Sequence, residues 1–202
     1  RTEEDKGTAF SNDILEAMKF IRQLRRDFSG ITINLSVAGI QQSTSAYPSN
    51  CDSVDPALTD MVAEMKSLNI AVVVSTGNDG IRGGISFPAC ISRTVKVAAS
   101  NTGTGEITPF SNMYYPPFYV GQFFMAPGSS IESAAPTNSY ALLSGTSMAA
   151  PHITGAFALI KAAAPTATVD DVNAYLVAAH SVQQNVPLGN GYAAALRRLR
   201  FF

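Results

Sequence analysis

The feature that most constrains the fold is a continuous run of mostly β-branched apolar residues at 70–75 (IAVVVS). A strand without alternating polar residues is typical of a parallel sheet with helices on both faces. Apolar residues at helical spacing over 13–27 and 55–68 alternate with strand patterns at 31–36 and 94–99. Because helices that alternate with strands imply right-handed crossovers, we expect an α/β sandwich.

Capping signals support these boundaries. Asp55 followed by Pro56 predicts a helix start, because an Asp N-cap accepts from first-turn N–H groups and proline suits the first turn. Thr168 and Asp171 form a capping-box-like pair ahead of the last helix. Residues 101–140 are interpreted as short strand fragments and turns.

The pattern opens on a helix with no strand ahead of it, which is unusual for a parallel sheet. Either one or more leading strands lie outside these 202 residues, or the sheet is unusually small. The length suits one domain, and the sequence contains no internal repeat or interdomain linker. We therefore expect residues 1–202 to form a single domain.

The low charge content excludes several function classes. Charged residues make up 14% and hydrophobic residues 46%, whereas disordered chains and coiled coils need far more charge. Fourteen Lys and Arg against 15 Asp and Glu give a net charge of −1, without the basic excess of a nucleic-acid-binding surface. The apolar run at 70–74 is far too short to cross a bilayer. This composition predicts a compact, secreted globular domain.

Two cysteines, Cys51 and Cys90, each lie in a turn-rich stretch that flanks a helix–strand unit. A disulfide between them would join two loops and contribute roughly 4 kcal/mol through loop-closure entropy. The alternative is a pair of buried, inert thiols in an intracellular enzyme. We favour the disulfide, which implies an oxidising compartment, extracellular or periplasmic.

The segment with the clearest chemistry is 143–152 (LSGTSMAAPH). A tight turn at Gly145 delivers Ser147 to the amino end of an Ala-rich helix, where unpaired backbone N–H groups suit a developing oxyanion. The nucleophile elbow of α/β-hydrolases is excluded, because Ala149 stands where that motif needs glycine. For an isolated serine in this position, helix capping would be the simpler interpretation.

The string GTSMAAPH at 145–152 resembles the nucleophile motif of the subtilisin-like serine proteases, the subtilases. Three further segments resemble that family in order and approximate spacing: 34–39 (NLSVAG), 73–80 (VVSTGNDG), and FSN at 110–112 followed by APG at 126–128. The resemblance covers roughly residues 10–195. It implies a subtilisin-like three-layer α/β sandwich with a mainly parallel sheet, here the C-terminal two-thirds of a catalytic domain without its N-terminal strands.

The resemblance also implies roles for individual residues. Ser147 is the nucleophile, and its backbone N–H forms the oxyanion hole together with the side-chain amide of Asn78. Three residues are implied to hold an extended substrate by strand addition: Ser36, Val37 and Ala38. Three others are implied to line one wall of the primary specificity pocket: Ser75, Thr76 and Gly77.

A serine nucleophile needs a general base and an orienting carboxylate, and neither stands in a recognisable motif here. His152 follows Ser147 by five residues, about 140° around and 7.5 Å along one helix, and is expected to face elsewhere. His180 is interpreted as a cap at the end of the last helix. Asp5 and Asp13 lie in charged or capping contexts and are not taken as triad members.

Three hypotheses for the function follow. The first is a serine endopeptidase that hydrolyses peptide bonds through an acyl-enzyme, with the catalytic His and Asp on a preceding segment or a second chain. The 202 residues alone would then be nearly inert. The second is a catalytically inactive subtilase-like module that binds extended peptides. The third is an interaction scaffold with neither property.

A polypeptide substrate in extended conformation is the expected partner, and neither nucleic acid nor a membrane is expected. Subtilases often bind calcium, which the resemblance therefore allows. Asp52, Asp55 and Asp60 are interpreted as turn, cap and surface positions, so no metal site and no cofactor is assigned.

Overall fold

The computed structural model describes residues 11–38, 46–114, 122–179, 181–187 and 193–199. Within these residues the centre is a six-stranded sheet with the order β1-β2-β3-β4-β8-β7. Neighbouring strands run parallel from β1 to β8, and β7 is antiparallel to β8. The strands are β1 (Thr32–Leu35), β2 (Ala71–Ser75), β3 (Val95–Ser100), β4 (Phe123–Pro127), β7 (Ser181–Pro187) and β8 (Ala193–Leu199).

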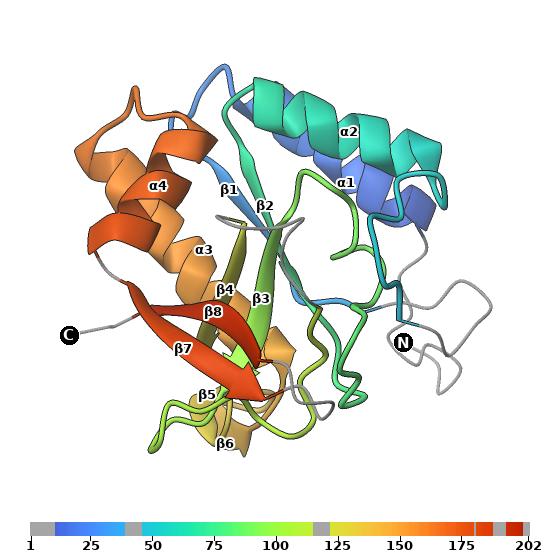
Figure 1. The fold of residues 1–202 in the computed structure, drawn as a ribbon. Coiled ribbons are helices and arrows are strands. Elements are labelled where there is room, and N and C mark those ends of the chain that lie inside the picture. The colour runs from blue at the N-terminus through green and yellow to red at the C-terminus, as the bar shows by residue number, and fades with distance from the viewer. Residues whose placement is uncertain (1–10, 39–45, 115–121, 180, 188–192, 200–202) are drawn as a thin grey trace.

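The described helices cover both faces of this sheet, two on each (Figure 1). The helices on one face pack against each other: α1 (Ser11–Leu24) and α2 (Pro56–Ser67). The helices on the other face are α3 (Thr146–Ala163) and α4 (Val169–Ala179). The predicted three-layer α/β sandwich with a mainly parallel sheet is therefore confirmed.

Strand β2 shows why its sequence is apolar throughout. Val72 and Val74 point into the core that lies beneath α1 and α2, whereas Ala71 and Val73 point into the core beneath α3. All five residues of the strand are buried. A strand with polar side chains at alternate positions would place them in one of these two apolar layers.

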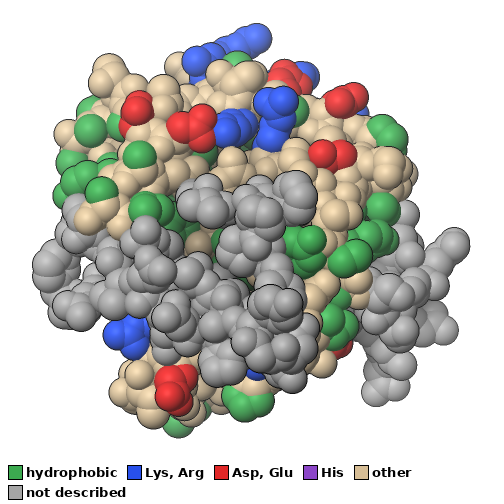
Figure 2. Space-filling model, viewed as in Figure 1, with side chains coloured by type: hydrophobic (Ala, Val, Ile, Leu, Met, Phe, Trp, Pro, Cys, Tyr) green, Lys and Arg blue, Asp and Glu red, His purple; other side chains and the backbone are tan. Residues whose placement is uncertain are grey.

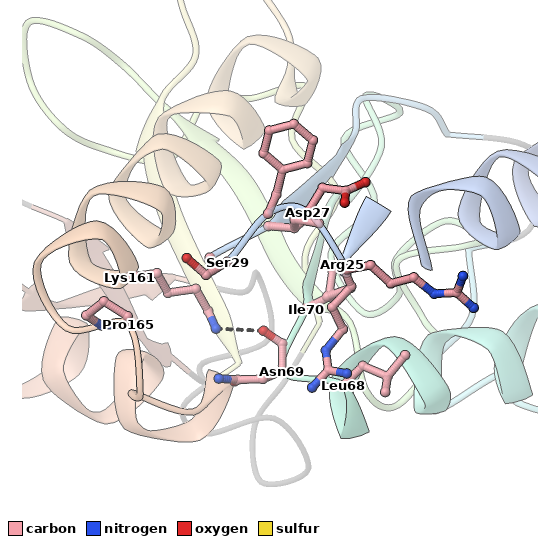
Figure 3. Close-up of a pocket in the computed structure, with 12 residues that line it drawn as sticks. Arg25, Asp27, Ser29, Leu68, Asn69, Ile70, Lys161 and Pro165 are labelled. Atoms are coloured by element: carbon pink, nitrogen blue, oxygen red, sulfur yellow. Dashed lines mark hydrogen bonds between the residues drawn. The ribbon is translucent and has the colours of Figure 1, made fainter. Parts of the chain in front are cut away.

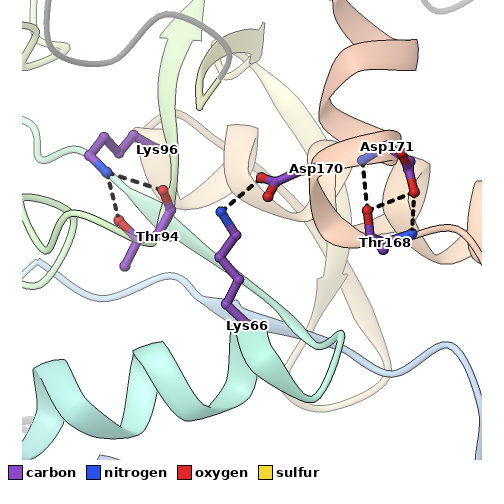
Figure 4. A network of polar contacts seen from close by, with 6 residues as sticks. All are labelled: Lys66, Thr94, Lys96, Thr168, Asp170 and Asp171. Atoms are coloured by element: carbon purple, nitrogen blue, oxygen red, sulfur yellow. Dashed lines mark hydrogen bonds and ion pairs between the residues drawn. The ribbon is translucent and has the colours of Figure 1, made fainter.

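Local capping follows the predicted chemistry. Asp55 Oδ1 accepts from the backbone N–H of Leu58 at 3.0 Å, and α2 begins at Pro56. Thr168 and Asp171 exchange hydrogen bonds ahead of α4, and these bonds lower the pKa of Asp171 (Figure 4). Gly30 ends the first helical segment with φ +76°, although α1 itself stops at Leu24, before the expected end near 27.

The sequence patterns missed two strands of the sheet, β7 and β8, which form a hairpin that the polar run at 183–185 did not indicate. This hairpin joins the sheet because β8 pairs with the distant strand β4, and a local pattern does not contain such a pairing. Strand β4 is one of the short strands predicted within 101–140, and it pairs with β3 over five residues.

Charges of both signs lie interspersed over the upper part of the face shown in Figure 2, in keeping with the net charge of −1. Among the described helices, none combines the length and apolarity that spanning a membrane requires.

A disulfide joins Cys51 to Cys90, with their Cα atoms 5.4 Å apart, so this prediction is confirmed. Both residues are buried, and the backbone N–H of Cys51 also donates to the carbonyl of Cys90. Asp52 Oδ1 accepts from the N–H of Ser92 at 2.8 Å. The loop before α2 is therefore fastened to the loop before β3 by one covalent bond and two hydrogen bonds.

We expect the double variant Cys51→Ser, Cys90→Ser to lower the free energy of unfolding by about 4 kcal/mol, because the unfolded chain regains loop entropy. Urea unfolding measures the change. Thiol counting under denaturing, non-reducing conditions provides the check on the native chain, and two free thiols there would contradict the disulfide.

A lysine lies fully buried in the sheet. The Nζ of Lys96, on β3, donates to the Thr94 carbonyl and to Thr94 Oγ1, each at 3.1 Å (Figure 4). It also donates to the carbonyl of Ile91 at 3.0 Å. Burial lowers the pKa of Lys96 to about 7; Asp52 opposes this shift and Lys66 adds to it. The ammonium of Lys96 donates to oxygens of the turn that follows Cys90, so the stability of this turn depends on the charge state of Lys96.

The pKa of Lys96 makes stability depend on pH. Between the folded value of about 7 and the ordinary value of 10.5, the unfolded chain binds the proton more strongly. The contribution of Lys96 to the free energy of unfolding therefore rises with pH across this window, by up to about 1.4 kcal/mol per pH unit. We expect Lys96→Met to remove this rise in urea unfolding from pH 6 to 10. Lys19→Met, at a position on α1 where 41% of the lysine side chain is accessible, is the matched control. Identical pH profiles for the native chain and Lys96→Met would refute the assignment.

Candidate active site

Ser147 is the second residue of α3, directly after the turn at Gly145. The N–H of Gly145 donates to the carbonyl of Gly128 at 2.8 Å, which fixes the approach of the chain to the helix. Ser147 is half-buried, and its backbone N–H has no acceptor among the described residues. First-turn N–H groups point outward along the helix axis, so this one remains available to a ligand oxygen.

Asn78 is hydrogen-bonded to the start of α3 through Thr146, and these two hydrogen bonds are here called the Asn78–Thr146 lock. Asn78 Oδ1 accepts from both the backbone N–H and the Oγ1 hydroxyl of Thr146, each at 2.9 Å. Thr146 Oγ1 in turn accepts from the N–H of Gly77 at 3.2 Å. Because a backbone N–H can only donate, the atom of Asn78 that faces it is the oxygen, and Nδ2 therefore lies on the exposed side. The structure thus brings the amide of Asn78 to the helix end that carries the N–H of Ser147.

The loop that carries Asn78 is organised by a buried asparagine. Asn112 Oδ1 accepts from the N–H groups of Asp79 (2.9 Å) and Ile81 (3.0 Å). Its Nδ2 donates to Asp79 Oδ2 (2.9 Å) and to Ser86 Oγ (3.1 Å). Gly77 has φ +106°, and a Cβ there would lie 2.4 Å from the Asn112 and Ser86 side chains. Both the backbone angle and the close approach require glycine at this position.

The predicted strand-addition segment meets Ser147 directly. Ser36 Oγ donates to the Ser147 carbonyl at 2.9 Å, and Ser147 Oγ donates to the Ser36 carbonyl at 3.3 Å. Ser75 Oγ donates to the carbonyl of Val37 at 3.2 Å, and Ala38 is exposed. The segment 36–38 is therefore held beside the serine by side-chain contacts at both of its first two residues.

The predicted pocket wall offers little side-chain surface. Ser75 and Thr76 are buried, and Thr76 Oγ1 donates to the carbonyl of Asn112 at 2.8 Å. The carbonyls of Thr76 and Gly77 accept from the N–H groups of Ser86 and Asn112. A substrate role for this wall, which stays a prediction, would therefore use backbone and Cα surface.

An open hollow of about 300 Å³ adjoins Ser147 on the side of the antiparallel hairpin formed by β5 (Ile131–Ala135) and β6 (Ser139–Leu143). Its lining residues are Ile131, Glu132, Ser133, Ser147, Met148, Pro151 and His152. Ser147 and His152 both border this hollow, although the helical spacing predicts that their side chains point in different directions.

The position of His152 does not make it the base of Ser147. His152 Nδ1 is hydrogen-bonded to the Met148 carbonyl, 2.9 Å away and one turn back along the same helix. Ser147 Oγ instead uses Ser36 as its acceptor. Asp13 lies exposed in the first turn of α1, while Asp5 and His180 fall outside the described residues.

The described residues contain no group of three or more His, Cys, Asp or Glu side chains placed to hold a metal. A larger hollow of about 550 Å³ lies where the C-terminal ends of α1, α2 and α3 meet (Figure 3). There the Nζ of buried Lys161 donates to the Asn69 carbonyl at 2.6 Å, and burial lowers the pKa of Lys161. Lys161 is about 20 Å along α3 from Ser147, so this hollow is separate from the serine.

Sequence reasoning missed the residues that hold the site together. Thr146 and Asn112 stand within the recognised motifs, but no structural role was predicted for them. No residue of β5 was predicted to border the hollow beside Ser147. The sequence signal for Thr146 and Asn112 is that both are polar residues within the recognised motifs. Polar residues beside a functional residue often belong to the hydrogen-bond network that supports it.

Comparisons with known proteins find a family match over most of the chain. The model of the Subtilase family matches residues 11–193. The intracellular serine protease of Paenibacillus polymyxa is 33% identical over 139 residues, which are 67% of this chain and 41% of that protein. Subtilisin Savinase of Lederbergia lenta is 35% identical over 114 residues, which are 56% of this chain and 40% of that protein. The chain thus spans about two-fifths of the length of these two relatives.

Solved structures show the same fold. A cold adapted subtilisin-like serine proteinase matches with a TM-score of 0.72 at 22% identity, covering 96% of this chain and 62% of that one. The prenylagaramide maturation protease PagA matches with a TM-score of 0.72 at 24% identity, covering 96% of this chain and 66% of that one. Nearly the whole chain therefore has a counterpart in each structure, whereas about a third of each structure has none here.

We expect Thr146→Val to weaken the positioning of the two candidate oxyanion donors, the Asn78 amide and the Ser147 N–H. The substitution keeps the shape but removes the hydroxyl that binds Gly77 and Asn78, which leaves the buried N–H of Gly77 unpaired at a cost of about 1–3 kcal/mol. Urea unfolding measures this loss, and the side-chain amide signals of Asn78 in ¹⁵N NMR should broaden or shift. Thr154→Val, on the same helix, serves as the control and should leave the Asn78 signals in place. Unchanged signals in Thr146→Val would show that the lock does not hold Asn78.

Proposed function

The chain belongs to the subtilase family, and on that premise we propose that it carries the nucleophile and the oxyanion-binding groups of a serine endopeptidase. The observation that carries this proposal is the Asn78–Thr146 lock, which presents a neutral amide donor beside the N–H of Ser147. The catalytic His and Asp belong to a preceding segment or to a second chain. Without them, the 202 residues are nearly inert.

In the proposed reaction, an extended polypeptide lies along residues 36–38, and Ser147 Oγ attacks its scissile carbonyl carbon. The histidine from outside the chain takes the hydroxyl proton and then passes it to the leaving amine as the C–N bond breaks. Water hydrolyses the resulting acyl-enzyme with help from the same histidine. The hydroxyl must first leave the Ser36 carbonyl, its acceptor in the unliganded chain.

The negative charge that develops on the carbonyl oxygen meets two donors that are already in place. The backbone N–H of Ser147 lies at the positive end of α3, and Asn78 Nδ2 is a donor without a titratable charge. Both are fixed by contacts that do not involve substrate, so they need no reorganisation during the reaction.

The substrate and the compartment follow from the same premise. The similar structures include a maturation protease and a macrocyclase in complex with peptide, which supports a polypeptide substrate for this chain. The disulfide between Cys51 and Cys90 suits an oxidising compartment, so we place the protein outside the cytoplasm, extracellular or periplasmic.

A catalytically inactive module that binds extended peptides is the second candidate. The bond from Ser147 Oγ to the Ser36 carbonyl favours it, because a hydroxyl that donates to a carbonyl is not activated by a base. Both candidates predict peptide binding along 36–38, and only the endopeptidase predicts covalent chemistry at Ser147.

A fluorophosphonate probe separates the two candidates. We expect it to label Ser147 when the segment with the His and Asp is present and to leave the 202-residue chain almost unlabelled, because the base is then absent. In the complete assembly, Ser147→Ala should abolish peptidase activity. Asn78→Ala should lower kcat with little change in KM; in subtilisin itself the loss of such a donor costs about 10²–10³ in kcat.

Ser67→Ala, at the exposed end of α2, is the matched control and should keep full activity. Peptide binding without labelling of Ser147 in the complete assembly would favour the inactive module. Full activity of Ser147→Ala would rule out the endopeptidase assignment.

A further inference from the structure

The hollow of about 550 Å³ at the carboxyl ends of α1, α2 and α3 has no part in the proposed function (Figure 3). It is here called the α1–α3 hollow, and its lining consists of residues 25–31, residues 68–70, Lys161 and Pro165. These residues belong to the loop between α1 and β1, the loop between α2 and β2, and the end of α3 with the turn after it. Sites for small molecules typically have volumes of roughly 300–1,000 Å³, so the hollow is large enough to hold one.

The lining of the α1–α3 hollow is predominantly positive. It contains Arg25, Arg26 and Lys161 but a single carboxylate, that of Asp27. Within the described part of the chain, none of these four side chains forms an ion pair. The lining therefore favours an anionic ligand, because an anion there meets cations that no protein carboxylate already occupies.

Lys161 is the buried member of this group, with 1% of its surface accessible. Figure 3 shows its side chain reaching from α3 toward the loop between α2 and β2, where Nζ donates to the Asn69 carbonyl at 2.6 Å. Nζ also donates to the carbonyl of Ala167 at 3.4 Å, which leaves one N–H of the ammonium without an acceptor among the described residues. Burial lowers the pKa of Lys161, and no described carboxylate opposes this shift. A bound anion would supply the counter-charge that this buried cation lacks.

The loop between α1 and β1 adds uncharged donors beside Lys161. A Cβ on Gly30 would lie 3.4 Å from the Cβ of Lys161, so this loop packs directly against α3. Within the described part of the chain, the backbone N–H groups of Ser29 and Gly30 have no acceptor, and the Ser29 hydroxyl has no partner. Gly30 has φ +76°, and consecutive free N–H groups at such a turn are typical of anion-binding loops.

A purely structural role explains only part of this arrangement. Cations that follow the last turn of a helix interact favourably with the helix dipole, which accounts for Arg25 and Arg26 directly after α1. The dipole does not require that a third cation be buried, since a lysine on a helix surface commonly keeps its ammonium in water. The burial of Lys161 beside free N–H groups therefore points to a ligand.

The donors of the hollow suit a phosphate group better than a carboxylate. They come from two elements, with Lys161 on α3 and the other donors on the loop after α1. A carboxylate offers two oxygens in one plane, whereas a phosphate monoester offers three oxygens and close to two negative charges. Two negative charges balance the three cations and the one carboxylate of the lining. Arginine is also well suited to phosphate, which its planar guanidinium binds through two parallel hydrogen bonds.

We propose that the α1–α3 hollow binds a small phosphate ester. Lys161, the N–H groups of Ser29 and Gly30 and the two arginines hold its phosphate. A phosphate ion is only a few times larger than a water molecule, which occupies about 30 Å³ in the liquid, so the ion alone would leave most of the hollow empty. The organic part of the ester lies against the apolar part of the lining, which includes Phe28, Leu68 and Pro165. Because Ser147 takes no part in it, this site is independent of the proposed function.

Calorimetric titration of the 202-residue chain with phenyl phosphate tests the proposal. Benzoate carries the same ring on a carboxylate, and inorganic phosphate lacks the ring, so these two are the comparison ligands. We expect saturable binding of phenyl phosphate at one site, about tenfold tighter than that of either comparison ligand. In ¹⁵N NMR spectra, phenyl phosphate should shift the amide signals of Ser29 and Gly30.

Variants of the lining locate the site. Arg25→Gln combined with Arg26→Gln should weaken the binding of phenyl phosphate about tenfold, because both exposed guanidinium groups are lost. Lys19→Gln combined with Arg93→Gln is the matched control, since it removes the same charge from two residues outside the lining. The control should keep the Kd within about twofold, because charges outside the hollow are screened by salt. Lys161→Gln should abolish binding; if it does not fold, the double arginine variant and the amide signals decide.

The remaining outcomes each overturn part of the proposal. No saturable binding of phenyl phosphate, or an equal loss of affinity in the control variant, overturns the site. Benzoate that binds as tightly as phenyl phosphate overturns the assignment to phosphate, and inorganic phosphate that does so overturns the assignment to an ester. A shift of the Ser147 amide signal without shifts at Ser29 and Gly30 places the anion at the serine and also overturns the site. Fluorophosphonate labelling of Ser147 tests the proposed function alone.

Discussion

The interaction on which the rest of the site depends is the lock between Asn78 and Thr146. Its two hydrogen bonds join the loop after β2 to the first turn of α3, residues that are 68 positions apart in the chain. The lock orients the amide of Asn78 by occupying its oxygen, and it fixes the end of the helix on which Ser147 lies. Asn112 holds the same loop from the other side, so the geometry is set before any substrate binds.

Helix α3 has two different environments along its length. One side packs its small residues Ala149 and Ala150 against the sheet, which brings Ser147 close to the carboxyl ends of β1 and β2. The side that faces away from the sheet exposes Pro151, Gly155 and Leu159.

Much of the fold could be predicted because its signals are local. The buried strand at 70–75, the Asp55 cap and the Thr168–Asp171 pair each depend on a few adjacent residues. The β7–β8 hairpin was missed, since it joins the sheet through the pairing of β8 with β4, which lies far away in sequence. The hydrogen bond of His152 to the Met148 carbonyl, one turn back along α3, agrees with the prediction that His152 is not the base of Ser147.

By itself, the sequence determined the family, the α/β class and the two cysteines that form the disulfide, and it predicted that Ser147 and Asn78 act together. This was possible because the consecutive residues of a motif determine both the local backbone conformation and the chemical groups at that position. Only the tertiary structure decided that Thr146 turns the amide of Asn78 outward, that the Ser36 carbonyl accepts from the serine hydroxyl, and that Thr154 of α3 donates to Asn34 of β1. These are contacts between segments about 70 to 120 residues apart, and their geometry exists only once the sheet has brought those segments together.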